Sequence, residues 1–318
     1  MEVYHALTDG TGALNFLCAL VYEYLRLRCP DEFPKPSPAL PYDASQSQRQ
    51  MDSFQQYYER PTRRAMRRAT SAYQIRGERL PKDHLAVLEG QMPLDQVLAC
   101  ARARGVTLTG LMVAVLLRAI HDGMRMRDRK KPVVITVPVN LRNYFPSRSA
   151  RNFFTTINVG YDFSKGEDTL EAVLAEVKCR LQENLTEDRL REHMNVLCAL
   201  EHSVPLQLVP LPLKDVILRA ANWLAAQGAT ASFSNVGKVP MPGGMEKLIH
   251  LFGAFTSAGK PQACACSYGG RYVVSFASSL QSREVERIFF RELAQMGIEI
   301  VLTTNLLPGE EGISDAVL

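Results

Sequence analysis

The stretch MEVYHALTDGTG, residues 1–12, places a histidine four residues before an Asp-Gly pair. A histidine has a pKa near neutrality, so it is suited to taking a proton from a hydroxyl or amine that attacks a substrate. An aspartate four residues later is well placed to pair with a cation and fix the loop, and a glycine allows a sharp turn into a helix. His5, Asp9 and Gly10 are therefore candidate site residues.

The residues that follow predict an α/β protein with a mixed sheet. Apolar residues at helical spacing predict a helix over 12–28 that ends before Pro30. Runs of β-branched residues predict strands, and the run at 131–141, apolar on both faces, predicts a central one. The expected strands are 84–92, 131–141, 152–163, 229–237 and a hairpin over 262–279 that turns at Gly269-Gly270. The expected helices are 51–60, 93–104, 106–125, 168–185, a further stretch to about 226, and 282–297.

Composition and charge exclude several classes of protein. The 318 residues carry a formal net charge of +4, which does not indicate a nucleic-acid binder. The longest apolar run is short and is interrupted by Arg118, so no membrane span is expected. The N-terminus lacks the features of a secretion signal, which predicts a cytoplasmic protein. One basic cluster predicts a solvated surface or, alternatively, an anion patch: Arg60, Arg63, Arg64, Arg67 and Arg68.

The cysteines and histidines indicate no metal centre. Seven cysteines are scattered without a Cys-x-x-Cys pair, which predicts reduced thiols. The histidines after His5 each stand alone, without the spacing of metal ligands.

Three stretches together resemble one enzyme family. HALTDGTG (5–12) resembles the active-site motif of the chloramphenicol acetyltransferase-like and condensation-domain acyltransferase superfamily. VPVNLRNYFP (137–146), followed by RNFF, resembles the strand-plus-arginine segment of these enzymes. SFSNVGKVPMP (232–242) resembles their Ser-Asn-x-Gly stretch near the cofactor tunnel. The three occur in the family's order, and the resemblance is closest to bacterial alcohol acetyltransferase-like proteins.

The resemblance implies a two-subdomain chloramphenicol acetyltransferase-like fold, with mixed sheets flanked by helices. Residues 1–80 would be the remainder of the N-terminal subdomain plus a crossover, and residues 81–318 the C-terminal subdomain. Family members place several strands and a helix before the histidine motif, whereas four residues precede His5 here. We therefore expect an N-terminally truncated chain with an incomplete first subdomain. Val3 and Tyr4 are expected to end a core strand.

The resemblance also implies roles for individual residues. His5 would be the general base, although many members have two successive histidines and this chain has Tyr4 in the first position. Arg142 would pair with Asp9, which would be structural; the alternative is a surface arginine at a strand end. Gly10 would keep the turn open beside the acyl carbonyl. Ser234, Asn235 and Gly237 would line the tunnel or support the oxyanion, but the same residues are equally typical of a strand-end turn.

The expected reaction is acyl transfer from acyl-coenzyme A, as co-substrate, to a small alcohol. No metal and no covalently bound cofactor is implied, and a separately encoded N-terminal part is a further expected partner. Two alternatives remain open. One is a condensation-type domain acting on carrier-bound acyl groups, and the other is an inactive homologue that acts as a binding protein.

Overall fold

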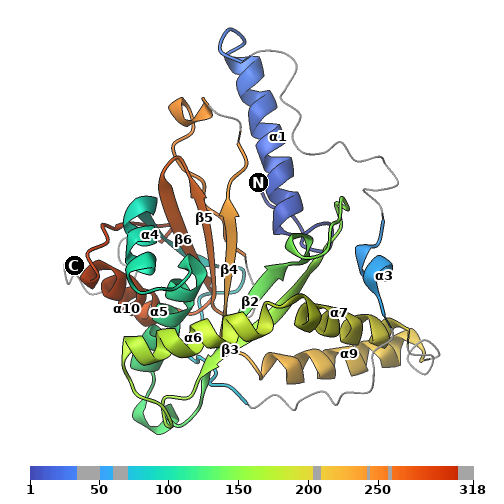
Figure 1. Ribbon diagram of the computed structural model, residues 1–318, viewed down its shortest axis with the longest axis vertical. Helices are drawn as coiled ribbons and strands as arrows, with labels where there is room; N and C mark the ends of the chain where they lie inside the picture. Colours follow the sequence, from blue (N-terminus) through green and yellow to red (C-terminus); the bar gives the residue numbers. More distant parts are fainter. Residues whose placement is uncertain (34–50, 60–70, 203–208, 242–243, 257–259, 307–318) are drawn as a thin grey trace.

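A computed structural model of the chain describes residues 1–33, 51–59, 71–202, 209–241, 244–256 and 260–306. One mixed sheet runs through the molecule, with helices packed against it (Figure 1). The arginine cluster at 60–68 and most of the proline-rich segment after Pro30 lie outside the described residues.

The helices form where apolar residues recur at helical spacing and, in several cases, where a side chain caps the first turn. Asp9, Asp52, Thr107 and Thr169 each accept a backbone N–H of the helix that follows. The helices are α1 (Gly10–Arg28), α3 (Ser53–Tyr57), α4 (Leu94–Ala103), α5 (Leu108–Asp122), α6 (Leu170–Asn184), α7 (Glu187–Glu201), α9 (Leu211–Ala226) and α10 (Glu284–Gln295). None of these described helices is by itself long and apolar enough to cross a bilayer.

The sheet has seven strands in the order β3-β2-β4-β5-β6-β1-β7. β2 pairs with β4, and β4 with β5, in parallel, and the other neighbours are antiparallel. The hairpin between β5 and β6 turns at Gly269 and Gly270, whose φ angles of 55° and 78° require glycine. The strands are β1 (Ala86–Pro93), β2 (Val133–Asn140), β3 (Phe154–Tyr161), β4 (Ala231–Lys238), β5 (Gln262–Tyr268), β6 (Arg271–Ser278) and β7 (Val301–Thr304).

The contact between β2 and β4 is short. Their register contains only the pairs Ile135–Ala231 and Thr136–Ser232. β2 then continues to Asn140 and β4 to Lys238 in different directions, so the upper halves of the two strands separate (Figure 1).

The two faces of the sheet are covered differently. α5 is buried almost throughout and packs with α6 and α10 on one face, where the main core lies. On the other face, Cys18 of α1 packs in a smaller cluster with Val239, Phe252, Cys266 and Tyr268. α1 is therefore held against the ends of β4, β5 and β6, and its first residues lie above the place where β2 and β4 separate.

The fold class expected from the sequence, α/β with a mixed sheet flanked by helices, is confirmed. Three details differ. Val3 and Tyr4 belong to no strand, and Tyr4 is 77% exposed, because nothing in the described residues pairs with this short stretch. β2 lies second from the edge, and its side chains are buried on one face only. β7 was not predicted. The division at residue 80 stays a prediction, although all seven strands follow it.

Candidate active site

Asp9 is the centre of a buried polar network. It precedes α1 in an extended conformation, and its Oδ1 accepts the N–H of Gly12 at 3.0 Å. Only 4% of the residue is exposed. An aspartate at this position satisfies a free N–H of the helix and is stabilised by the positive end of the helix dipole.

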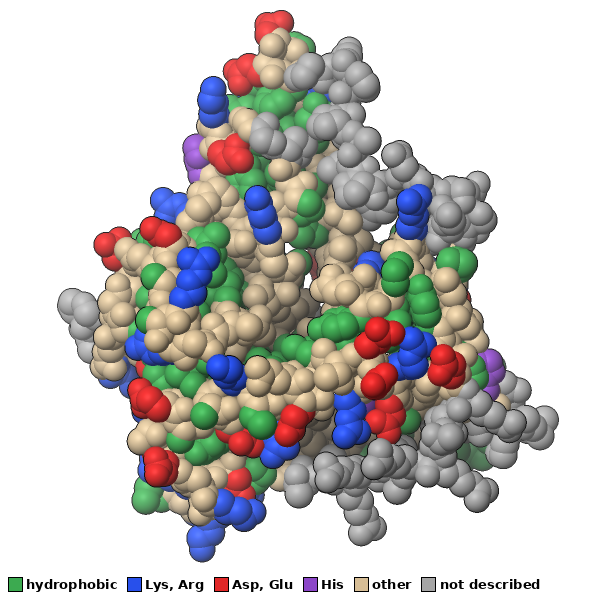
Figure 2. Space-filling view, viewed as in Figure 1, with side chains coloured by type: hydrophobic (Ala, Val, Ile, Leu, Met, Phe, Trp, Pro, Cys, Tyr) green, Lys and Arg blue, Asp and Glu red, His purple; other side chains and the backbone are tan. Residues whose placement is uncertain are grey.

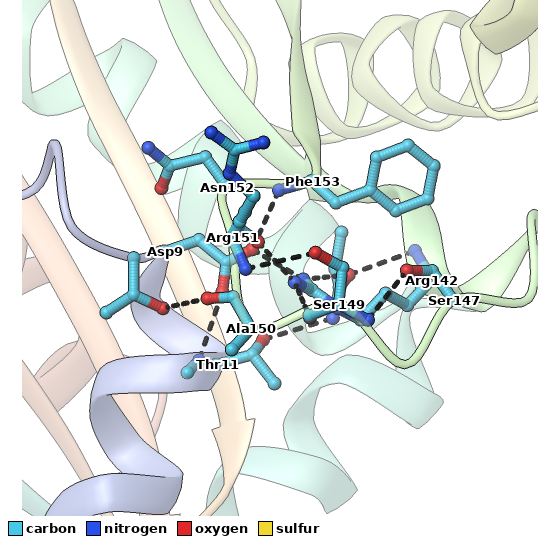
Figure 3. A network of polar contacts seen from close by, with 12 residues as sticks. Asp9, Thr11, Arg142, Ser147, Ser149, Ala150, Arg151, Asn152 and Phe153 are labelled. Carbon is cyan, nitrogen blue, oxygen red and sulfur yellow. Dashed lines mark hydrogen bonds and ion pairs between the residues drawn. The ribbon is translucent and has the colours of Figure 1, made fainter. Parts of the chain in front are cut away.

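The second carboxylate oxygen of Asp9 binds residues that are more than 130 positions away in the sequence. Arg142 Nη1 donates to Oδ2 at 2.5 Å, and the N–H of Phe153 donates to the same atom at 3.0 Å. Arg142 Nη2 donates to the carbonyls of Ser149 and Arg151 at 2.9 and 2.7 Å. The arginine therefore links Asp9 to the loop that leads into β3 (Figure 3).

Arg142 is itself oriented by the end of β2. Its backbone N–H donates to the side chain of Asn140 at 3.0 Å, which begins the short 3₁₀ turn Leu141–Asn143. The side-chain amide of Asn140 in turn donates to Thr11 Oγ1 of α1 at 3.1 Å. The end of β2 and the start of α1 are thus fixed to each other by side chains of both elements.

Two further hydrogen bonds hold the loop that carries His5. Asn152 Nδ2 donates to the backbone carbonyl of His5 at 3.0 Å. Thr8 Oγ1 donates to the carbonyl of Ala150 at 2.7 Å. The backbone of residues 5–9 is therefore fixed against residues 150–153 even though residues 1–4 have no regular structure.

The His5 side chain is exposed and lies beside β3. Its ring centroid is 5.5 Å from that of Phe154, with the two planes tilted by 44°. Its backbone position is well determined by the loop, but no described side chain hydrogen-bonds its imidazole. An imidazole in this state can accept a proton from a group that approaches from solvent.

The glycine that the geometry requires is Gly12, not Gly10. A Cβ on Gly12 would lie 2.0 Å from Thr8 Oγ1, whereas a Cβ on Gly10 would meet nothing within 4 Å. The role of Gly10 beside an acyl carbonyl stays a prediction. The need for glycine at position 12 comes from the hydrogen-bonded Thr8, and the sequence contained no signal for it.

The second group of expected site residues lies on β4. Asn235 donates through Nδ2 to Thr109 Oγ1 at 3.0 Å and accepts the N–H of Gly237 at 3.1 Å. Gly237 has a φ of 85° and sits at a bulge in the pairing with β5. Ser234, which pairs with Cys264, is half-buried. Asn235 therefore links β4 to the first turn of α5. Gly237 lies inside β4, which continues to Lys238, so these residues form a bulge within the strand and not a strand-end turn.

The structure places these two groups on either side of an opening. Arg142 and Asp9 lie at the end of β2, and Asn235 lies on the upper half of β4, beyond the two residue pairs that join the strands. Figure 2 shows the surface hollowed between β4 and the start of α1. The two groups share no hydrogen bond among the described residues.

Other features of the molecule do not contribute to this site. A cavity of about 90 Å³ lies at the opposite end of β4 and is lined by Tyr73, Ser232 and Gln262, among others. A more open one of about 390 Å³ lies between Arg118, Thr169 and Glu292. The described part of the chain contains no cluster of three or more histidine, cysteine or acidic side chains that could hold a metal ion.

The thiols near α1 are packed groups. Burial raises the pKa of Cys18 to about 11 and that of Cys266 to about 12. Both thiols are therefore protonated at neutral pH, and neither is suited to act as a nucleophile there.

Comparison with known proteins identifies the fold. No family model and no curated protein matches the sequence. Among solved structures, the TRI101 protein of Fusarium sporotrichioides, crystallised with coenzyme A and T-2, superposes with a TM-score of 0.55 at 12% identity over 92% of this chain and 65% of its own. The TRI3 trichothecene 15-O-acetyltransferase of the same organism superposes with a TM-score of 0.54 at 14% identity, over 91% of this chain and 63% of its own. The first condensation domain of the calcium-dependent antibiotic synthetase superposes with a TM-score of 0.51 at 16% identity, over 92% of this chain and 62% of its own.

The chain has the chloramphenicol acetyltransferase-like fold. It spans a little under two thirds of the length of these three proteins. The identities are low, so the likeness establishes the fold and leaves the activity to the site itself.

Proposed function

We propose that this protein is an acyltransferase that moves an acyl group from acyl-coenzyme A to the hydroxyl of a small alcohol, with His5 as the general base. The observation that supports this most directly is the network around Asp9. Arg142, the N–H of Phe153 and the N–H of Gly12 bind the carboxylate together, which fixes the loop that carries His5. A base acts efficiently only when its backbone is held in one position.

In the proposed reaction His5 removes the proton from the acceptor hydroxyl as the oxygen attacks the thioester carbonyl. The tetrahedral intermediate collapses with cleavage of the carbon–sulfur bond, and the protonated imidazole returns its proton to the leaving thiolate. The acyl group then forms an ester with the acceptor, and no covalent acyl-enzyme is needed. Asp9 takes no part in proton transfer, because all its hydrogen bonds are directed into the protein.

The hollow between β4 and the start of α1 is the place where we expect the two substrates to meet. Ser234, Asn235 and Gly237 would form its wall on the β4 side. Asn235 donates one amide N–H to Thr109 and accepts the N–H of Gly237, so we assign it a shaping role first, and its second amide N–H is the donor that it could offer to the oxyanion.

Two alternatives are favoured by specific observations. The structural likeness to a condensation domain supports a reaction with carrier-bound acyl groups. The exposed imidazole of His5, which no described side chain hydrogen-bonds, supports an inactive homologue that acts as a binding protein. We expect a cytoplasmic location under all three readings.

The test is release of free coenzyme A from acetyl-coenzyme A in the presence of a panel of short alcohols. His5→Ala should lower turnover by roughly 10²-fold or more, since a general base contributes about 10²–10⁴-fold. His84→Ala is the matched control, because His84 is an exposed histidine whose ring hydrogen-bonds the backbone carbonyl of Lys82. Turnover that survives His5→Ala overturns the base assignment. Activity with acylated carrier protein alone would favour the condensation-type domain. An absence of turnover with either acyl donor would favour the inactive homologue.

A further inference from the structure

Asn152 has a buried oxygen atom that lacks a hydrogen-bond donor. Its Nδ2 donates to the backbone carbonyl of His5 at 3.0 Å. Because that carbonyl can only accept, the bond also fixes which end of the carboxamide is the oxygen. Oδ1 is shielded from solvent, and within the described parts of the chain it has no hydrogen-bond partner. A buried acceptor in this state costs free energy, so a donor is expected for it.

The side of the chain that carries Asn152 also contacts the ring of His5. Figure 3 shows the side chains of Asn152 and Phe153 pointing to opposite sides of the chain, and Phe153 is buried in the main core. The next residue, Phe154, begins β3 and returns to the side of Asn152, as the period of two in an extended chain requires. Its ring centroid lies 5.5 Å from that of His5. The entry to β3 therefore contacts both the backbone and the ring of His5.

We propose that Asn152 is a positioning residue for His5, whose imidazole Nδ1–H donates to Asn152 Oδ1. The proposal rests on the proposed function, in which His5 is the base. By standard bond lengths Oδ1 lies about 2.2 Å from Nδ2, and so within about 5 Å of the His5 carbonyl oxygen to which Nδ2 is bonded. Nδ1 is the ring nitrogen nearer to that backbone. Because the His5 side chain is exposed, rotation about its side-chain bonds can bring Nδ1 to this position.

This hydrogen bond decides which ring nitrogen of His5 is the base. A neutral imidazole carries one N–H, and the other nitrogen has the free lone pair. With Nδ1–H donated to Asn152, the lone pair is on Nε2. Nε2 then takes the proton from the acceptor hydroxyl as the carbon–oxygen bond forms, and returns it to the thiolate as the carbon–sulfur bond breaks. Asn152 neither gains nor loses a proton.

The position of the imidazole proton can be measured without substrate, by nitrogen NMR of the full chain with isotope-labelled histidine. The signals of His5 are identified by their loss in His5→Ala. We expect neutral His5 to carry its proton on Nδ1, and Asn152→Ala to shift the proton toward Nε2. Asn158→Ala is the matched control, because it removes an exposed asparagine of β3 that bonds Thr136 and should leave the proton on Nδ1. A wild-type chain with the proton on Nε2 overturns the proposal, whether or not the variants fold.

Asn152→Asp separates this role from a purely structural one. Aspartate keeps an acceptor for Nδ1–H but loses the donor to the His5 carbonyl, so the proton should stay on Nδ1. A residue that only holds the loop would instead make the aspartate and alanine variants equivalent, which overturns the proposal.

Turnover gives a second measurement. Asn152→Ala should lower kcat about 10-fold or more and leave the KM for acetyl-coenzyme A unchanged, and Asn152→Asp should restore part of kcat. An unchanged kcat with a raised KM would show that Oδ1 binds substrate, and overturns the proposal. If Asn152→Ala moves the proton in a chain that has no turnover, the positioning role of Asn152 stands and the proposed function fails.

Discussion

Arg142 donates through Nη1 to Asp9 Oδ2 at 2.5 Å, and both side chains are largely buried, with 15% and 6% exposed. The arginine adds bonds to the carbonyls of Ser149 and Arg151. A planar guanidinium can reach all three acceptors at once, which an ammonium group cannot.

Arg142→Lys should therefore lower the free energy of unfolding by about 2–4 kcal/mol, because it leaves buried acceptors without donors. The measurement is denaturant unfolding followed by circular dichroism. Arg26→Lys is the control, since Arg26 forms a partly exposed pair with Glu23 one helical turn away and should cost about 0.5 kcal/mol or less. Equal losses for the two variants would show that the Asp9 network does not stabilise the fold.

Gly12→Ala should lower the melting midpoint, since its Cβ would collide with Thr8 Oγ1, at a cost of about 1–3 kcal/mol. Thr8→Ala in the same chain should restore part of this loss by removing the obstructing atom. Gly10→Ala, which meets open space, should leave stability unchanged. If Gly10→Ala nevertheless reduces acyl transfer, Gly10 acts on the substrate and not on the fold. A harmless Gly12→Ala would contradict the close approach described here.

Asn235→Ala should cost about 1–2 kcal/mol of stability, because it removes the bonds to Thr109 and to the N–H of Gly237. A double-mutant cycle with Thr109→Val isolates the first of these bonds. We expect a coupling energy of about 0.5–1.5 kcal/mol. A coupling near zero would mean that the link between β4 and α5 is not energetically significant.

His121 predicts a pH dependence of stability. It is 4% exposed and stacks on Phe163 with ring centroids 3.9 Å apart. Burial lowers its pKa below the ordinary value of 6.5; Arg129 and Arg118 act in the same direction, and Asp168 and Asp122 oppose it. Between the two pKa values the unfolded chain binds more protons than the folded one, so stability falls as the pH falls below about 6.5.

His121→Gln should flatten this slope in an unfolding series between pH 7.5 and 5, as it removes the titrating group. His84→Gln, at an exposed position, should keep the wild-type slope. An unchanged slope in His121→Gln would assign the pH dependence to other groups.

Much of the fold follows from local patterns in the sequence. The spacing of apolar residues after Gly10 predicted α1, and Gly269-Gly270 predicted the β5–β6 hairpin, because both signals are contained within one element. β7 was missed since VLTT is short and largely exposed, and its pairing with β1 depends on a strand more than 200 residues earlier in the sequence. The strand expected at Val3 and Tyr4 was implied by the family resemblance, and it is absent because no described strand pairs with these residues.

The site was predictable only in part. Asp9 and Arg142 were expected to pair through the family resemblance, and the ion pair is present in the structure. The bonds from Asn152 to His5 and from Thr8 to Ala150 join residues more than 140 positions apart. Neither has a sequence spacing that could reveal it. These contacts exist because the tertiary fold brings the start of β3 against the start of α1.

The two residue pairs between β2 and β4 make this the weakest seam of the sheet. This short contact divides the sheet into two parts, here called leaves. One leaf consists of β3 and β2 and leads to Arg142, and the other consists of β4, β5, β6, β1 and β7 and carries Asn235. Because so few ladder bonds fix the angle between the leaves, that angle also depends on α1, which packs against the ends of β4, β5 and β6 and is bonded to the end of β2. The width of the hollow beside His5 is thus set by the bonds of Asp9 and Thr11 to the end of β2 as well as by the short β2–β4 ladder.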